Sequence, residues 1–198
     1  MNQFKSMQHS LTQAFNNFQA VFKIELNPCS EILILEYQGQ SFIVEKIIPN
    51  AAQVTINING AKIIVNNFDE TKTFKIVNAQ ILGFIPIDGK EGLLGFGKSY
   101  CDFIFFDNQD FCFVESKLNA TSERKVNKKR QEAVEQLGNT VEEFNQGLDN
   151  NYQLFNLEAY VCSPNFYPRN DATWETFARK FLEKYHIDLF EAREKFCR

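Results

Sequence analysis

Two carboxylates and one lysine lie on either side of a short polar turn, at Asp102, Glu115 and Lys117. Apolar residues flank the turn at residues 107–110, which predicts two buried antiparallel strands. If the turn is centred between residues 108 and 109, Asp102 lies opposite Glu115. Paired residues, and residues two apart on a strand, share one face of a sheet. The three side chains are therefore predicted to converge.

This convergence creates an electrostatic problem. Two carboxylates whose Cβ atoms are about 5 Å apart in apolar surroundings repel each other and lose hydration. A bound cation or a retained proton would relieve the repulsion. The alternative is an inert ion-pair network, in which Lys117 neutralises most of the charge. Cys101 is predicted to face away from Asp102 and to be structural.

A concentrated basic segment begins seven residues after Lys117, although the whole chain carries a net charge of −4. A charge run of this kind is often only the solvated start of a helix. Beside a carboxylate pair that holds a metal, it favours attraction of phosphate groups. The predicted nucleic-acid contacts are Arg124, Lys125, Lys128, Lys129 and Arg130.

The composition indicates a folded chain of 198 residues, since 44% are apolar and 21 are Phe. No apolar run approaches the length of about 18 residues that is needed to span a bilayer, and the first ten residues lack a signal-peptide core. The five Cys form no Cys-x-x-Cys pair, which suits a reduced protein. A cytoplasmic protein without membrane contact is expected.

Hydrophobic periodicity predicts a mixture of helices and strands. An apolar stripe over residues 4–22 predicts one helix, and residues 134–148 and 174–185 predict two more, followed by a helical tail to residue 198. Asn59-Gly60 is a strong hairpin signal. Strands are expected at 31–37, 41–48, 53–58, 61–65, 72–87 (one or two strands) and 152–162.

A glycine-rich segment precedes Asp102, and Gly92 to Ser99 formally matches a P-loop. A P-loop must follow a strand and open a helix, whereas a β-rich stretch follows here. A loop near the catalytic residues is therefore favoured over a third hypothesis, a nucleotide-binding protein.

The order of a strand with Asp102, a strand with Glu115-Ser116-Lys117, a helix with a basic start and a further strand resembles the PD-(D/E)XK nuclease superfamily. The resemblance covers roughly residues 85–165, and Gln136-Leu137 looks like the Gln-Leu of its exonuclease branch. It implies an α/β (α+β) fold, with a restriction endonuclease-like core whose mixed central sheet is flanked by helices. The expected division is a strand-rich N-terminal region at 1–85, the core at 86–165 and a helical segment at 166–198.

The resemblance also implies the activity. Asp102 and Glu115 would bind Mg²⁺ or Mn²⁺, which would polarise a phosphate and activate water. Lys117 would orient that water or stabilise charge, and Gln136 would position the water or a phosphate oxygen. The expected function is a metal-dependent nuclease with DNA favoured over RNA, acting as a homodimer where both strands are cut. The alternative is a nuclease-fold binding or regulatory subunit without catalysis.

Two features depart from the family pattern. Cys101 stands where many members have Pro, and the predicted helix at 4–22 lacks the acid that many members supply from that helix. Glu91, Glu45 and Glu31 are the candidate replacements, and the sequence does not distinguish among them.

Overall fold

The computed structural model of the chain describes residues 2–26, 31–48, 51–95, 98–118, 123–149, 151–164 and 172–197. The α-helices in these ranges are α1 (Gln3–Ala14), α2 (Phe18–Val21), α3 (Glu123–Leu148) and α4 (Ala172–Tyr185). Single 3₁₀ turns lie at η1 (Glu70–Lys72) and η2 (Asn151–Leu154).

Six strands form the core sheet in the order β1-β7-β8-β9-β10-β11. Their bounds are β1 Lys23–Leu26, β7 Ile81–Pro86, β8 Phe103–Phe106, β9 Asp110–Ser116, β10 Asn156–Cys162 and β11 Asp188–Glu191. Neighbours from β1 to β9 are antiparallel, whereas β10 is parallel to β9 and β11 is parallel to β10. The sheet is therefore mixed, as the resemblance implies.

A second sheet, the outer sheet, has the order β12-β6-β2-β3-β4-β5. Its strands are β2 Glu31–Tyr37, β3 Gln40–Ile48, β4 Gln53–Ile58, β5 Ala61–Asn66, β6 Thr73–Val77 and β12 Glu194–Phe196. The predicted strands at 31–37 and 53–58 are confirmed. The Asn59-Gly60 hairpin is confirmed too, with both residues at positive φ (51° and 86°).

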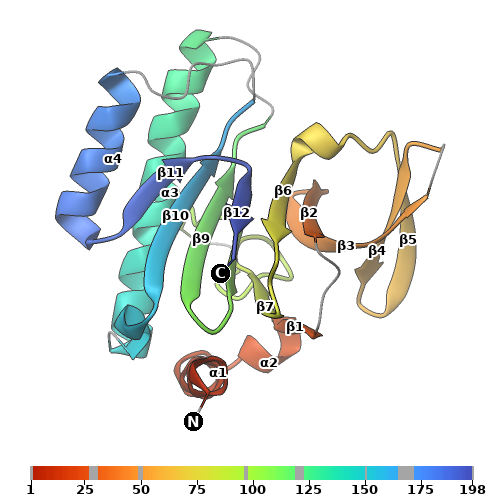
Figure 1. Cartoon of the computed structure of the whole chain (residues 1–198), viewed down its shortest axis with the longest axis horizontal. Coiled ribbons are helices and arrows are strands. Elements are labelled where there is room, and N and C mark those ends of the chain that lie inside the picture. Colours follow the sequence, from red (N-terminus) through yellow and green to blue (C-terminus); the bar gives the residue numbers. More distant parts are fainter. Residues whose placement is uncertain are drawn as a thin grey trace.

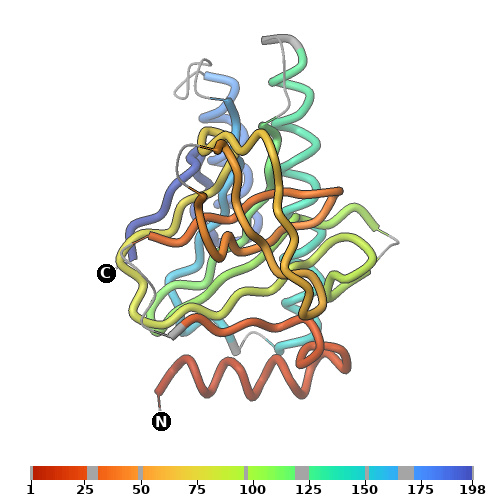
Figure 2. The backbone as a smooth tube through the Cα atoms, turned by 90° about the vertical axis from the view of Figure 1, so that its right-hand side faces the viewer, coloured from red at the N-terminus to blue at the C-terminus, as the bar shows by residue number. Residues whose placement is uncertain are grey.

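The molecule is layered, with the core sheet in the middle (Figure 1). Helices α3 and α4 cover one face of the core sheet, and strands of the outer sheet lie against the other face. Helix α1 crosses beneath the strand ends (Figure 2). Apolar side chains fill both interfaces, with Ile104 and Phe113 facing the helices, and Phe105 and Val114 facing the outer sheet.

The prediction of a single helix at residues 4–22 is wrong, because the helix ends at Ala14. The side chain of Asn17 donates to the carbonyl of Leu93 at 2.9 Å. Asn competes with helical hydrogen bonds in this way. The chain then resumes as the short α2 and turns into β1.

The helical tail predicted after residue 185 is also wrong, because the chain forms β11 and β12. In β11, Leu189 and Glu191 are buried while Asp188 and Phe190 are exposed, which is the alternation of a strand. Pairing of β11 with β10 and of β12 with β6 determines that this segment forms strands.

The predicted boundaries at 85 and 165 do not separate the two sheets. Strand β1 pairs with β7 in the core sheet, although both lie largely within the first 85 residues. Strand β12, from the C-terminal segment, pairs with β6 of the outer sheet. The outer sheet is therefore an insertion between β1 and β7 that the C-terminal strand completes.

Candidate active site

The β8–β9 hairpin has the predicted register. Phe103 pairs with Val114, which puts Asp102, just before β8, opposite Glu115. The backbone N–H of Asp102 donates to the carbonyl of Val114 at 3.1 Å. The backbone N–H of Ser116 donates to Asp102 Oδ2 at 2.6 Å, which fixes the carboxylate against β9.

A chain of hydrogen bonds joins the lysine to the helix layer. Lys117 Nζ lies 2.5 Å from Glu115 Oε1 and donates to Gln136 Oε1 at 2.6 Å. Gln136 Nε2 donates in turn to the carbonyl of Tyr100 at 2.9 Å. The structure thus brings Gln136 to Lys117, and through it to Glu115.

Side chains of α3 about one helical turn beyond Gln136 hold the helix in register with the residues that precede β8. Thr140 Oγ1 accepts from the backbone N–H of Cys101 at 2.9 Å and donates to the carbonyl of Gln136 at 2.9 Å. Asn139 Nδ2 donates to the carbonyl of Ser99 at 2.9 Å. Cys101 is fully buried in the core, and burial raises the pKa of its thiol well above the ordinary value. A structural role for Cys101 fits this position.

Burial makes the two acids hard to ionise together. Glu115 is 1% exposed; burial, followed by the charge of Asp102, raises its pKa well above the ordinary value. Burial also raises the pKa of Asp102 to about 7, against the opposing Ser116 N–H. Burial lowers the pKa of Lys117, but the hydrogen bond to Glu115 and the charges of Glu115 and Asp102 together outweigh this effect, and the pKa ends above its ordinary value. In the absence of a cation, both carboxyl groups are therefore harder to ionise near neutral pH than ordinary carboxyl groups.

A second carboxylate–lysine cluster lies between the two sheets, and its carboxylates are paired differently. Lys195 Nζ lies 3.0 Å from Asp110 Oδ2 and 2.7 Å from both oxygens of Glu158. Tyr160 donates to Glu158, and Asn156 donates to Asp110 at 3.1 Å. Each carboxylate oxygen of this cluster thus has a donor.

Glu115 differs in this respect. Among the described residues, its Oε2 is one of only two buried side-chain oxygen or nitrogen atoms that have no hydrogen-bond partner. The other is Oδ1 of Asn108, in the hairpin turn. A buried carboxylate oxygen without a donor costs free energy unless a ligand satisfies it. Carboxylate oxygens are the ligands that Mg²⁺ and Mn²⁺ prefer.

Two further carboxylates act on this site, and the sequence reasoning missed both. The charges of Glu36, near the end of β2, and of Asp88, just after β7, both raise the pKa of Asp102. Asp88 was detectable: β7 and β8 are adjacent and antiparallel, so the end of β7 lies beside the start of β8. Glu36 was not detectable from the sequence, because it lies in the outer sheet, whose position beside the site no local pattern predicts.

The basic residues of α3 separate into two groups. Lys125 and Lys128 are exposed and Lys129 is half-buried; Lys128 lies 3.6 Å from Glu132. The side chain of Arg124 lies outside the described residues.

The prediction that Arg130 contacts nucleic acid is wrong, because its side chain is buried. It is 2% exposed and bonds both oxygens of Glu191, through Nε at 2.9 Å and Nη2 at 2.6 Å. Its guanidinium also lies 5.7 Å from the ring centroid of Trp174.

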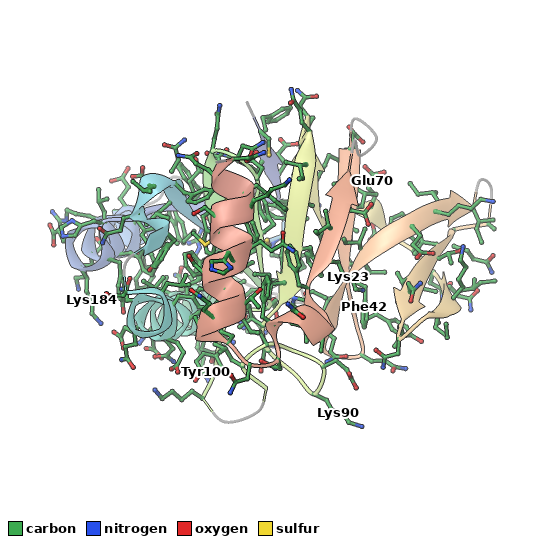
Figure 3. The ribbon with its side chains drawn as sticks, turned by 90° about the horizontal axis from the view of Figure 1, so that it is seen from below. Lys23, Phe42, Glu70, Lys90, Tyr100 and Lys184 are labelled. Carbon is green, nitrogen blue, oxygen red and sulfur yellow. The ribbon has the colours of Figure 1, made fainter. Side chains whose placement is uncertain are left out.

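The glycine-rich segment lacks the helix that a P-loop requires. Residues 98–102 are not helical, and β8 follows at Phe103. Leu93, in the middle of the motif, is buried in the core. The chain around Lys90 and Tyr100 instead lies along one side of the molecule (Figure 3).

Comparison with known proteins gives no relative, since no family model, curated protein or solved structure matches the chain. Among the described helices, none is both long and apolar enough to cross a membrane. Function must therefore be inferred from the site itself.

Proposed function

We propose that this protein is a metal-dependent nuclease that hydrolyses phosphodiester bonds, with DNA favoured over RNA. The observation that carries the proposal is the partnerless Oε2 of Glu115, buried next to Asp102. Lys117, which would neutralise the two acids, donates to the other oxygen of Glu115, Oε1, and to Gln136. Oε2 of Glu115 therefore remains available to coordinate a cation.

The sheet topology supports the same proposal. Strands β7, β8 and β9 form an antiparallel meander, α3 follows, and β10 returns parallel to β9. This is the order of elements that the sequence resemblance implies for a restriction endonuclease-like core. Asp102 lies just before β8 and Glu115 lies near the end of β9, at one end of the sheet.

Each residue of the site has a distinct role in this mechanism. Asp102 and Glu115 would hold Mg²⁺ or Mn²⁺, which when bound polarises a phosphate and lowers the pKa of water. Lys117 holds a positive charge at the site, where it orients the attacking water or stabilises negative charge on the phosphate. Gln136 positions Lys117 by accepting one of its hydrogen bonds.

Helix α3 offers a path for the nucleic-acid backbone. Lys125 and Lys129 precede Gln136 by 11 and 7 residues, so helical geometry puts all three on one face. The backbone positions of the two lysines are about 6 Å apart along the axis. They would contact phosphates next to the scissile one, and a homodimer would supply the second site for cutting both strands.

A binding or regulatory subunit without catalysis is the competing function. The absence of any acid in α1 favours it, since fewer carboxylates are then available to hold a metal. The two functions differ in whether phosphodiester bonds are broken.

The test is a cleavage assay with Mg²⁺ or Mn²⁺ on linear, circular, single-stranded and branched DNA and on RNA. We expect cleavage by the wild-type protein, and a loss of at least about 100-fold in Glu115→Gln and in Lys117→Met. The matched control is Glu158→Gln, which changes a carboxylate paired with Lys195 on the neighbouring strand. It should retain the wild-type rate per folded molecule.

Cleavage at the wild-type rate by both Glu115→Gln and Lys117→Met would refute the proposed site. Metal and DNA binding without cleavage of any substrate would favour the binding subunit. Circular dichroism of each variant separates loss of chemistry from loss of fold.

A further inference from the structure

The candidate site depends on the placement of two carboxylates, because the three candidate replacements for the helix acid lie elsewhere. Glu31 and Glu45 pair with lysines of the outer sheet, at 3.4 and 3.7 Å. Glu91 is exposed and lines a separate cavity of about 230 Å³. A metal site with few ligands relies on the groups that orient them. The contacts that place Asp102 against Glu115 and the lysine therefore matter most.

Thr140 of α3 joins the two halves of the candidate site. Its Oγ1 accepts from the backbone N–H of Cys101, the residue before Asp102, at 2.9 Å. The same Oγ1 donates to the backbone carbonyl of Gln136 at 2.9 Å, and the side chain of Gln136 holds Lys117. One hydroxyl therefore ties the segment that carries Asp102 to the helix that positions the lysine.

The hydroxyl of Thr140 is well suited to serve both partners. Thr140 and Cys101 are both fully buried. The N–H of Cys101 lies two residues before β8 begins, and its acceptor is this side chain and not a strand carbonyl. A buried N–H that loses its acceptor is costly. A hydroxyl has one donor and two lone pairs, so it can donate and accept at once, whereas valine of similar shape can do neither.

Neighbouring strands fix Asp102 only within the sheet. Its N–H donates to the carbonyl of Val114 at 3.1 Å, and its own carbonyl accepts from the N–H of Ile87 at 2.9 Å. Such bonds lie in the plane of a sheet, so they leave the distance between the sheet and the helix layer to other contacts. Thr140 supplies a polar contact across that distance, one residue away from Asp102. The helix layer is also the side on which Lys117 is held.

We propose that Thr140 is a positioning residue of the candidate site, and that its hydroxyl sets the placement of Asp102 relative to Lys117. The inference rests on the proposed function, because it concerns the same cation and the same lysine. Thr140 acts through Cys101 and Gln136 and takes no part in the chemistry itself.

A purely local role in the helix is the competing explanation. Thr12 gives the matched comparison, because its Oγ1 donates to the carbonyl of Gln8, four residues earlier in α1, at 2.8 Å. Its side chain is half-buried. Valine at Thr12 removes the same kind of bond within a helix as valine at Thr140 does. It leaves the bond to Cys101 intact.

The experiment combines the cleavage assay with calorimetric titration of the full chain with Mn²⁺ at pH 8. We expect Thr140→Val to lower kcat at least about tenfold while KM for the nucleic acid changes less than about twofold. Mn²⁺ binding should weaken at least about tenfold, the range seen when a supporting group of a metal site is lost. Thr12→Val should match the wild type in both measurements.

Thr140→Ser is the rescue variant, since serine keeps a hydroxyl that can bond both partners. Its kcat and Mn²⁺ affinity should lie within about threefold of the wild type. Thr140→Ala serves if Thr140→Val does not fold, because it removes the hydroxyl without placing a methyl group against the N–H of Cys101. It should lower kcat and Mn²⁺ affinity in the same direction, and circular dichroism checks the fold of each variant.

Wild-type kcat and Mn²⁺ affinity in Thr140→Val, or equal losses in Thr140→Val and Thr140→Ser, would overturn the inference. A wild-type protein that bound Mn²⁺ but cut no nucleic acid would refute the proposed function, and the Mn²⁺ titrations would still test Thr140. A wild-type protein that neither bound Mn²⁺ nor cut nucleic acid would refute the cation site itself, and the inference with it.

Discussion

At the scale of single residues, Asp102 and Glu115 are arranged at a cost to the fold. Buried acids resist ionisation, and Lys117 is shared between Glu115 and Gln136. The comparable cluster around Lys195 gives its carboxylates a full set of donors. The difference between the two clusters is what separates a candidate metal site from a structural ion-pair network.

Stability should therefore depend on pH through Asp102. Its pKa of about 7 in the fold lies above the ordinary value of 3.8, so between these values the folded state retains a proton that the unfolded state loses. Stability must fall as pH rises through this window. We expect metal-free wild type to lose about 2 kcal/mol more than Asp102→Asn between pH 5 and pH 8.

The measurement is urea denaturation of both proteins at the two pH values, without metal. Saturating Mn²⁺ should then raise the Tm of the wild type more at pH 8 than at pH 5.5, because the cation replaces the proton. Parallel pH profiles for the two proteins would show that Asp102 does not titrate in this window.

The sequence was sufficient to predict part of this site. The hairpin register follows from one polar turn centred between residues 108 and 109 and flanked by apolar strands, so Asp102 and Glu115 could be placed opposite each other. Asp88 and Glu36, whose charges raise the pKa of Asp102, were not identified, because neither lies in the β8–β9 hairpin. Arg130 was misassigned, since a charge run does not reveal which arginine faces the core.

At the scale of elements, α3 both positions the site and fixes the layers. Gln136 and Thr140 reach the hairpin, while Arg130, nearer its start, is bound to Glu191 of β11. A buried pair of this kind leaves an uncompensated charge when one partner is removed.

We expect Arg130→Met to reduce the free energy of unfolding by about 3 kcal/mol or more, because buried Glu191 would lose the guanidinium that bonds both of its oxygens. Arg179→Met is the matched control: Arg179 pairs with Glu183 at 4.0 Å on the exposed side of α4, and should cost less than about 0.5 kcal/mol. Chemical denaturation measures both. A loss below about 1 kcal/mol, together with weakened DNA binding, would restore Arg130 as a nucleic-acid contact.

Lys125 and Lys129 of α3 should contribute to DNA binding and not to metal binding. Lys125→Gln with Lys129→Gln should weaken DNA binding and lower the slope of log K against log salt by about one for each phosphate that is no longer bound. Mn²⁺ affinity should stay unchanged. Lys184→Gln, on α4, is the control; an equal effect there would indicate non-specific attraction.

Helices and strands were predicted best where an apolar pattern marks the face of the element that is buried. The strands of the outer sheet and the apolar stripe of α3 are of this kind. The break after Ala14 and the strands β11 and β12 were missed, because long-range bonds decide them: Asn17 to Leu93, and pairing with β10 and β6. Local periodicity carries no information on such contacts.

At the scale of the whole molecule, the inserted outer sheet extends as far as the site. A cavity of about 220 Å³ lies between the sheets, with Glu36 of β2 on one wall and Ser116 of β9, the donor to Asp102, on another. The site is thus bordered by α3 on the helix side and by the outer sheet on the opposite side. Under the proposed function, we expect the inserted outer sheet to shape the access of substrate to the metal.

The central claim, that Asp102 and Glu115 bind a divalent cation, is tested most directly by anomalous diffraction from crystals grown with Mn²⁺ at pH 8. At this pH Asp102 is ionised, since its pKa is about 7. The account predicts an anomalous peak within coordination distance of Asp102 and of Glu115 Oε2. It would be contradicted by no peak there, or by a peak only at the buried group of Asp107, Asp110 and Cys197.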